Sequence, residues 1–293
     1  MNAFKYGDPM RTLTNLIIWL GMLIVVPAGL RLIGGGPVRR VAGHWYWGAV
    51  PGAVALWLPR GPVAAALAAA YAALTLLLAA AAPARLAGRR PTAAAPARLA
   101  GHRPTADDVA VGTALAAPSV AAVALVAERA GYALFGFEPT VLVLTVAHFH
   151  FAGFAAALTA GLVNRLDGGR PARLAAWSVP AGTGVVLLGY FTGETVELAG
   201  ALLLTAGMWL VGGLTWRHVR PGTTDLLTRA LLGVSAAVLA ASMVLAVSWA
   251  LGEATGVPHP SLGWMAATHG VANALGFALC GILAWRRLHP APL

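Results

Sequence analysis

Long runs of apolar residues, separated by short polar or basic segments, dominate the chain. About 20 apolar residues in a helix span the hydrocarbon core of a bilayer, and the pattern contains nine such runs. We therefore predict an all-α polytopic membrane helix bundle that forms one transmembrane domain over residues 1–293 and lies in the cell membrane. The predicted spans are 12–31, 43–59, 62–82, 108–129, 139–164, 174–192, 194–216, 226–251 and 261–285.

The second predicted span differs from the others. It is short, begins near His44-Trp45-Tyr46-Trp47 and contains Pro51. Because proline removes a backbone hydrogen bond from a helix interior, we expect this span to be kinked or re-entrant.

Basic side chains gather on one side of the predicted spans. If the N-terminus lies outside, the cytoplasmic segments hold 16 arginines and the outer segments hold four basic residues. Cytoplasmic loops carry an excess of Lys and Arg, so we expect an outer N-terminus and a cytoplasmic C-terminus. The cytoplasmic set is Arg31, Arg39, Arg40, Arg85, Arg89, Arg90, Arg98, Arg103, Arg165, Arg170, Arg173, Arg217, Arg220, Arg229, Arg286 and Arg287, and the outer set is Lys5, Arg11, Arg60 and Arg129.

Composition supports a membrane protein over a nucleic-acid-binding one. The net charge is +10, but only 10% of the residues are charged and 59% are hydrophobic, whereas soluble proteins carry about 25% charged residues. The arginines lie in short loops and form no continuous stripe, so we expect them to contact the lipid bilayer and no nucleic acid. Cys280 is the single cysteine, which excludes an internal disulfide.

The longest loop contains a duplication. Residues 83–93 read PARLAGRRPTA and residues 96–106 read PARLAGHRPTA. This composition cannot build a packed core, so we predict a disordered, basic cytoplasmic loop over residues 83–106. A tolerated loop expansion explains the duplication better than a functional repeat.

Histidines inside two predicted spans form the candidate site. An ionisable side chain at the bilayer centre costs about 2.5–3.5 kcal/mol on insertion scales and usually has a function. The fifth span carries His148, which lies on the order of 13 Å below the outer boundary at about 1.5 Å per residue. The ninth span carries His269 at about 12 Å by the same rise, and Asn273 follows one turn later on the same face. We therefore predict that His148 and His269 meet in the outer half of the membrane.

The neighbours of His148 divide into two groups. Residues two apart on a regular helix point about 200° apart, so His148 and His150 cannot both address one centre. We expect His148 and Thr145 to face the bundle interior, and His150 to pack against a neighbouring helix or to hydrogen-bond a backbone carbonyl. In the alternative reading, all three histidines only link helices by hydrogen bonds.

Carboxylates begin the seventh span. Glu194 and Glu197 share one face near the outer end, and the alternative is an ordinary acidic pair that stabilises a helix N-terminus. Glu197 sits deeper and is the stronger candidate. Glu128 is explained by charge balance with Arg129. Glu253 and His259 fall in an outer loop and should be solvated.

Imidazole and carboxylate groups in a low-dielectric pocket suit proton transfer. We expect an acid–base enzyme of the isomerase, cyclase or hydrolase type that acts on a small lipophilic substrate. His148 would be the acid or base, His269 its partner, Asn273 an orienting donor and Glu197 the carboxylate. The alternative functions are a proton-coupled secondary transporter that uses the same residues and a sensor or assembly subunit in which none of them titrates.

The pattern requires no cofactor. A single metal ion held by His148, His269 and Glu197 and a haem between the two histidines are further alternatives. Glycine-rich phosphate loops are missing from the sequence, so we expect no nucleotide-driven transport by this chain alone.

Two segments resemble one protein family. Residues 147–154, AHFHFAGF, resemble the His-Phe-His-aromatic-Ala-x-Phe element of the YndJ-like family of bacterial membrane proteins, and residues 268–277, THGVANALGF, look like its C-terminal His…Asn-x-x-Gly-Phe element. The resemblance covers two helices and the multi-span layout, while the Ala-rich stretch 62–106 has no counterpart. It implies that His148, His150, His269 and Asn273 are shared polar positions, and it leaves the reaction open.

Overall fold

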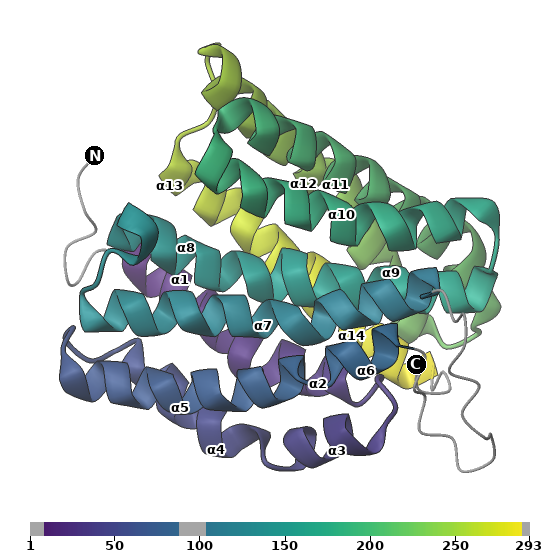
Figure 1. Ribbon diagram of the computed structural model, residues 1–293. Coiled ribbons are helices and arrows are strands. Elements are labelled where there is room, and N and C mark those ends of the chain that lie inside the picture. Colours follow the sequence, from purple (N-terminus) through teal and green to yellow (C-terminus); the bar gives the residue numbers. More distant parts are fainter. Residues whose placement is uncertain (1–8, 88–103, 289–293) are drawn as a thin grey trace. The chain divides into compact units, whose positions relative to one another are not determined.

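The computed structural model describes residues 9–87 and 104–288 as helices joined by short connections (Figure 1). No strand occurs in these two stretches. Eight of their helices are long and apolar enough to cross a membrane, by length and composition. They are Pro9–Leu30, Pro62–Leu86, Ala106–Ala130, Pro139–Asp167, Arg170–Thr192, Glu194–Gly222, Leu226–Thr255 and Leu262–Leu288. The predicted all-α polytopic membrane protein is thereby confirmed, while the membrane it occupies and the orientation of its termini stay predictions.

The chain divides into two compact units. Unit 1 comprises the described residues of Met1–Pro104 and Gly112–Ala155, and unit 2 those of Thr105–Val111 and Ala156–Ala291. Two long helices, Ala106–Ala130 and Pro139–Asp167, each contribute residues to both units. That residues 1–293 act as a single domain stays a prediction.

Unit 1 contains the first half of the spans. Its first span is α1 (Pro9–Leu20), the π-helical η1 (Gly21–Val25) and α2 (Val26–Leu30). There follow α3 (Gly36–Gly43), α4 (Trp45–Ala55), α5 (Pro62–Ala79) and α6 (Ala82–Leu86). Most of α7 (Ala106–Ala130), the short η2 (Leu134–Gly136), α8 (Pro139–His148) and the π-helical η3 (Phe149–Ala155) complete it.

The predicted second span, 43–59, is not among the eight helices that are long and apolar enough to cross a membrane. It contains α4, a helix of 11 residues with Pro51 inside it, and His44 separates α4 from the short helix α3. Just after α5, Arg85 of α6 donates to the carbonyl of Gly34, which precedes α3 (2.6 Å). Further along, a Cβ at Gly52 of α4 would lie 2.6 Å from the Tyr71 Cβ of α5. Helices α3 and α4 therefore run back along α5, as the ribbon shows (Figure 1).

A buried arginine of α7, Arg129, caps the C-terminal end of α4. Arg129 and Glu128 are 0% and 2% exposed and pair with each other. Arg60 adds a second ion pair to Glu128 (2.9 Å). The last carbonyls of a helix lack donors within the helix, and the Arg129 guanidinium supplies one. Its Nη1 lies 3.3, 3.4 and 3.2 Å from the carbonyl oxygens of Ala55, Leu56 and Leu58. The charge balance expected between Glu128 and Arg129 is present. Both side chains are buried, and Arg129 also caps a helix.

Unit 2 contains the second half of the spans. It holds α9 (Ala156–Asp167), α10 (Arg170–Thr192), α11 (Glu194–Leu214), the π-helical η4 (Thr215–Val219) and η5 (Arg220–Gly222). It continues with α12 (Leu226–Thr255), α13 (Leu262–Met265), the π-helical η6 (Ala266–Gly270) and η7 (Ala272–Leu279), and α14 (Cys280–Leu288).

Glycines bring α10 and α11 into close contact. The predicted tight turn between them is a single residue, Gly193, at φ 121°. A Cβ at Gly182 would lie 2.5 Å from the Leu204 nitrogen, and one at Gly200 would lie 2.5 Å from the Val186 nitrogen. Small residues of this kind let membrane helices approach backbone to backbone.

The predicted disordered loop is described only at its edges. Residues 88–103 lie outside the described part of the chain. At its start, α6 (Ala82–Leu86) is a short helix. At its end, Thr105 and Asp108 form reciprocal hydrogen bonds that cap α7, which is the capping-box arrangement.

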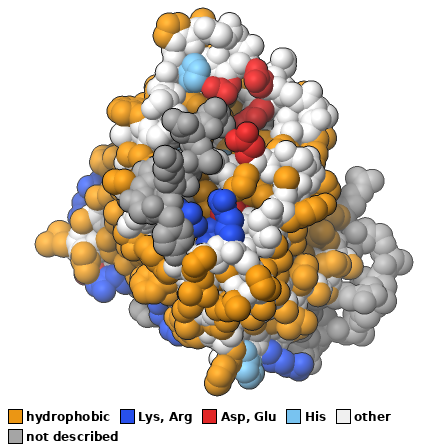
Figure 2. Space-filling view, turned by 90° about the vertical axis from the view of Figure 1, so that its left-hand side faces the viewer, with side chains coloured by type: hydrophobic (Ala, Val, Ile, Leu, Met, Phe, Trp, Pro, Cys, Tyr) orange, Lys and Arg blue, Asp and Glu red, His pale blue; other side chains and the backbone are white. Residues whose placement is uncertain are grey.

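Apolar side chains cover much of the surface that Figure 2 presents. Large exposed hydrophobic residues occur in both units, for example Trp47 (81%) in unit 1 and Leu226 (78%) in unit 2. Soluble monomers rarely expose large contiguous apolar patches. This surface suits contact with lipid hydrocarbon.

The contacts of Arg129 with Glu128 and with the carbonyls at the end of α4 predict that replacing Arg129 lowers stability strongly. Arg129→Met should lower the free energy of unfolding by about 3–5 kcal/mol, because it leaves Glu128 and the α4 carbonyls partly unsatisfied. Arg60→Met removes a partner that is 39% exposed and should cost about 1 kcal/mol or less. Unfolding with dodecyl sulfate in mixed micelles measures both. Equal losses of unfolding free energy in the two variants would contradict this role of Arg129.

The cap of α12 predicts a pH dependence. Hydrogen bonds from the Thr228 hydroxyl, Arg287 and the Thr228 amide lower the pKa of Asp225 from 3.8 to about 2. A depressed folded-state pKa adds stability above the unfolded pKa, and that stability disappears as pH falls through the folded pKa. Wild-type thermal stability should therefore fall between about pH 4 and pH 2. Asp225→Asn should lower stability at pH 7 and lose less of it on acidification; an unchanged acid profile would contradict this.

Candidate functional site

Both histidine elements singled out in the sequence contain π-helical turns. His150 lies in η3, His269 in η6 and Asn273 in η7. A further π-helical segment, η1, contacts η3. Such turns are rare and often occur at functional sites, because the wider turn changes the direction in which side chains project. Helical irregularity therefore coincides with the candidate residues.

In unit 1, His150 forms a fully buried hydrogen-bonded pair with Tyr71. Both side chains are 0% exposed. The His150 Nδ1 lies 2.6 Å from the Val146 carbonyl oxygen, and its Nε2 lies 2.6 Å from the Tyr71 hydroxyl. A carbonyl can only accept, so Nδ1 carries the proton and Nε2 accepts from Tyr71. Both ring nitrogens are thereby occupied.

Packing on every side holds this pair in place. The rings of His150 and Tyr71 stack with centroids 5.8 Å apart, and Trp45 meets Tyr71 edge-on at 5.8 Å. The Trp45 indole donates to the Met22 carbonyl (2.7 Å). Gly21 of η1 lies against His150, where an added Cβ would come within 2.9 Å of the His150 Cβ. Helices α4 and α5 and segment η1 thus enclose the imidazole.

His148 and Thr145 lie elsewhere on the same span. His148 is half-buried, and its ring meets Phe149 edge-on at 5.9 Å. Thr145 is buried, and its hydroxyl donates to the Val141 carbonyl one turn earlier (2.8 Å). His150 packs on neighbouring helices and bonds a carbonyl, as expected for the second histidine. It is also the more deeply buried of the two histidines. It lies in a π-helical segment, to which the angle of about 200° between residues two apart on a regular helix does not apply.

In unit 2, His269, Asn273 and Ser242 form a network between the last span and α12. The His269 Nδ1 lies 2.8 Å from the Ser242 carbonyl oxygen, so Nδ1 carries the proton. Asn273 donates to the His269 carbonyl (2.8 Å) and accepts from the Ser242 hydroxyl (3.0 Å). Among the described residues, none bonds the His269 Nε2. The bond at Nδ1 fixes the orientation of this imidazole and leaves the lone pair of Nε2 free.

The last span approaches α12 closely because of a glycine. A Cβ at Gly276 would lie 2.5 Å from the Val238 side chain, and Ser235 donates to the Phe277 carbonyl (3.0 Å). These contacts hold His269 and Asn273 beside Ser242. Both side chains are partly buried.

The predicted carboxylates gather at another level of unit 2. Glu194 is exposed and Glu197 half-buried, and Glu253 lies within electrostatic reach of Glu197. His259 pairs with Glu253 (3.2 Å), and Figure 2 shows acidic side chains and a histidine in the upper part of that face. Eleven residues of α12 separate Glu253 from Ser242, or about 16 Å along the axis. The carboxylates therefore do not touch the His269 network.

The residues of the predicted metal site are distributed over the two units. His148 belongs to unit 1, and His269 and Glu197 to unit 2. In neither unit do the described residues include a group of three His, Cys, Asp or Glu side chains that could hold a metal ion. The meeting of His148 with His269 stays a prediction.

Three members of these networks escaped the sequence reasoning. Tyr71 interrupts an Ala- and Leu-rich span, which was a usable signal because a buried tyrosine needs a partner for its hydroxyl. Trp45 belongs to an aromatic cluster that the sequence marked only as unusual. Ser242 gave no signal, because one serine in an Ala-rich span is typical of helix packing.

The His150–Tyr71 pair predicts an energetic coupling. Tyr71→Phe removes the hydroxyl that His150 accepts from, and His150→Leu removes the acceptor. A double-mutant cycle by dodecyl sulfate unfolding should give a coupling energy of about 0.6–1.7 kcal/mol, the range for hydrogen bonds between membrane helices. Tyr132→Phe is the matched control, since Tyr132 is 63% exposed. A coupling energy near zero would contradict the pair.

Comparison with known proteins places the chain in a family. The family model described as YndJ-like protein matches residues 16–277. A search of curated proteins and a search of solved structures gave no match. The match includes both histidine elements and leaves out 15 residues at the N-terminal end and 16 at the C-terminal end. This multi-pass membrane protein therefore belongs to the YndJ-like family.

Proposed function

We propose that this protein is a membrane-embedded acid–base enzyme whose principal base is the Nε2 atom of His269. The observation that carries the proposal is the hydrogen bond from His269 Nδ1 to the Ser242 carbonyl (2.8 Å). A partner of this kind on one ring nitrogen sets which nitrogen carries the proton. It leaves the Nε2 lone pair ready to accept a proton from a substrate.

Asn273 would stabilise the charge that develops on the substrate. Its side chain is held by Ser242 and by the His269 backbone. One N–H of its amide donates to the His269 carbonyl. The other points to no acceptor in the described residues, because the protonated Nδ1 of His269 (3.2 Å) cannot accept. A positioned amide donor of this type lowers the barrier for forming an oxyanion.

The proposed step conserves atoms and charge. Nε2 takes a proton from a carbon or hydroxyl of the substrate and becomes part of an imidazolium ion. The negative charge left on the substrate faces the Asn273 amide. The imidazolium returns the proton at a second position, which gives an isomerised product without any other reactant. In a cyclisation, the deprotonated substrate atom bonds to an unsaturated carbon and the proton goes to the neighbouring carbon. In a hydrolysis, Nε2 takes its proton from water, the oxygen adds to the substrate and the proton goes to the leaving group.

The surroundings favour a small lipophilic substrate. His269 and Asn273 are partly buried on a helix long and apolar enough to span a membrane. A molecule that reaches them from the bilayer must itself dissolve in hydrocarbon. His148 enters this proposal as the second acid or base. Glu194 and Glu197 begin α11 near Glu253, which lies about 16 Å along α12 from Ser242, so they do not take the proton directly.

A labelling experiment tests the proposal without a known substrate. Purified protein is incubated with a bacterial membrane lipid extract in deuterated water, or in water labelled with heavy oxygen. Mass spectrometry should find a lipid species that gains deuterium if the enzyme isomerises or cyclises it, or heavy oxygen if it hydrolyses it. His269→Ala should reduce the labelling rate at least about 100-fold, as loss of a general base does, and Asn273→Ala should reduce it to a smaller extent.

A matched histidine variant controls for nonspecific effects. His44 also has its Nδ1 on a backbone carbonyl, that of Arg40 (2.9 Å), but it is exposed at the junction of α3 and α4. His44→Ala should keep the labelling rate. His148→Ala tests whether His148 shares the site. Labelling that persists in His269→Ala would refute the proposal.

Proton-coupled transport is the second candidate. The carboxylates Glu194, Glu197 and Glu253 at one end of unit 2 favour it, because intramembrane carboxylates are typical of proton pathways. A transporter would show proton uptake in sealed vesicles under a substrate gradient and no labelled lipid in detergent. If the protein is a transporter, Glu197→Gln should abolish that uptake. If the enzyme proposal is correct, Glu197→Gln should leave lipid labelling unchanged.

A further inference from the structure

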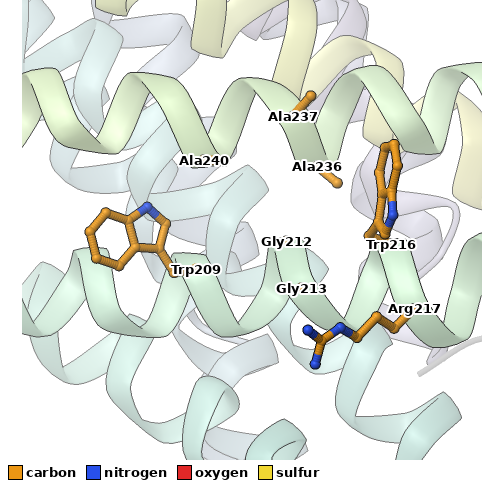
Figure 3. Close-up of a pocket in the computed structure, with 8 residues that line it drawn as sticks. All are labelled: Trp209, Gly212, Gly213, Trp216, Arg217, Ala236, Ala237 and Ala240. Atoms are coloured by element: carbon orange, nitrogen blue, oxygen red, sulfur yellow. The ribbon is translucent and has the colours of Figure 1, made fainter.

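A groove in unit 2 lies on two neighbouring spans, apart from the His269 network. Its volume is about 490 Å³, within the range of small-molecule sites. Its lining residues come from α11 with η4 and from α12, both parts of helices that could cross a membrane. Figure 3 shows the groove between these helices, with Trp209 toward one end and Trp216 toward the other. Because both helices could cross a membrane, we expect this apolar space to open toward lipid.

Small residues form the floor of this groove. Gly212 and Gly213 contribute from α11, and Ala236, Ala237 and Ala240 from α12. A Cβ at Gly213 would meet no atom within 4 Å, so the space above it is open. Trp209 and Arg217 are eight residues apart, which makes the groove about 12 Å long. A flexible hydrocarbon chain fits a space of this form.

The wall at Trp216 is held in place from behind. The Arg220 guanidinium lies 4.4 Å from the Trp216 ring centroid, a cation–π contact. Arg220 also donates to the Arg229 carbonyl (3.3 Å). Trp216 is therefore pre-positioned, and its exposed face (47% for the residue) remains available to a ligand.

Arg217 gives the groove a positive end. Its guanidinium reaches back along α11 toward Gly213 (Figure 3), and Arg217 is exposed. Asp167 and Asp225, which lie in or beside the connections at this end, are bound to His218 and Arg287. Within the described residues, no carboxylate pairs with Arg217. Its charge is left for an anion, and a guanidinium binds phosphate through two parallel hydrogen bonds.

We infer that this groove binds one anionic phospholipid, with an acyl chain between Trp209 and Trp216 and the headgroup phosphate on Arg217. Basic pockets between membrane helices are known to bind anionic headgroups. The arginine-rich segments around residues 165–173 and 217–229 lie on the side that charge bias predicts to be cytoplasmic. The lipid would therefore come from that leaflet.

Native mass spectrometry in detergent tests the inference with phosphatidylglycerol and phosphatidylcholine of identical chains. The wild type should retain one phosphatidylglycerol molecule more strongly than phosphatidylcholine. Arg217→Gln should weaken phosphatidylglycerol binding about tenfold, the order expected for loss of a charge-assisted hydrogen bond. Gly213→Leu should remove the bound lipid, because its side chain enters the open space without a clash.

Matched variants on α10 serve as controls. Arg173→Gln makes the same charge change at an exposed arginine outside the groove. Gly184→Leu adds the same side chain at another exposed glycine with no atom within 4 Å of its Cβ. Both should bind phosphatidylglycerol like the wild type.

Three results would overturn the inference. They are wild-type affinity in both groove variants, equal losses in the α10 controls, and a protein dimer that Gly213→Leu dissociates. Glycerophosphoglycerol, the headgroup without acyl chains, should not compete; full competition by it would show an anion site without a lipid groove. Because the two groove variants act by different means, a folding failure in one leaves the other to decide.

Discussion

Inside a bilayer, a polar group without a partner costs several kcal/mol, and this constraint shapes every polar contact in the two units. In unit 1, Arg129 offers its charge to Glu128 and its remaining N–H groups to the last carbonyls of α4. The chain can therefore end α4 and begin α5 with the last carbonyls of α4 satisfied by a buried side chain.

The same constraint makes the two histidines chemically different. His150 has a partner on each ring nitrogen, Val146 on one and Tyr71 on the other, so it has no lone pair to offer. His269 has a carbonyl on Nδ1 and no bonded partner among the described residues on Nε2. One imidazole is thus suited to holding unit 1 together, and the other to exchanging a proton.

Small residues determine where these contacts can form. Gly21 makes room for His150, and Gly276 lets the last span approach α12 closely enough for His269 to reach Ser242. On another face of α12, Ala236, Ala237 and Ala240 line a groove together with Gly212 and Gly213, and the space above Gly213 stays open. Glycine and alanine therefore create close contact at one surface and a groove at another, and only the larger neighbours distinguish the two outcomes.

The hydrophobic pattern by itself determined the helical membrane fold, the positions of the long spans and the pairing of His269 with Asn273, because helix length and one-turn spacing are local properties of the chain. It also marked the segment around His148 and His150. Only the tertiary structure decided that residues 43–59 form a short helix after His44, that Tyr71 and Ser242 are the partners of the histidines, and that Glu197 lies near Glu253 and away from the His269 network. Those contacts join residues 27 to 79 positions apart, and hydrogen-bond geometry over such separations depends on how helices pack, which periodicity does not encode.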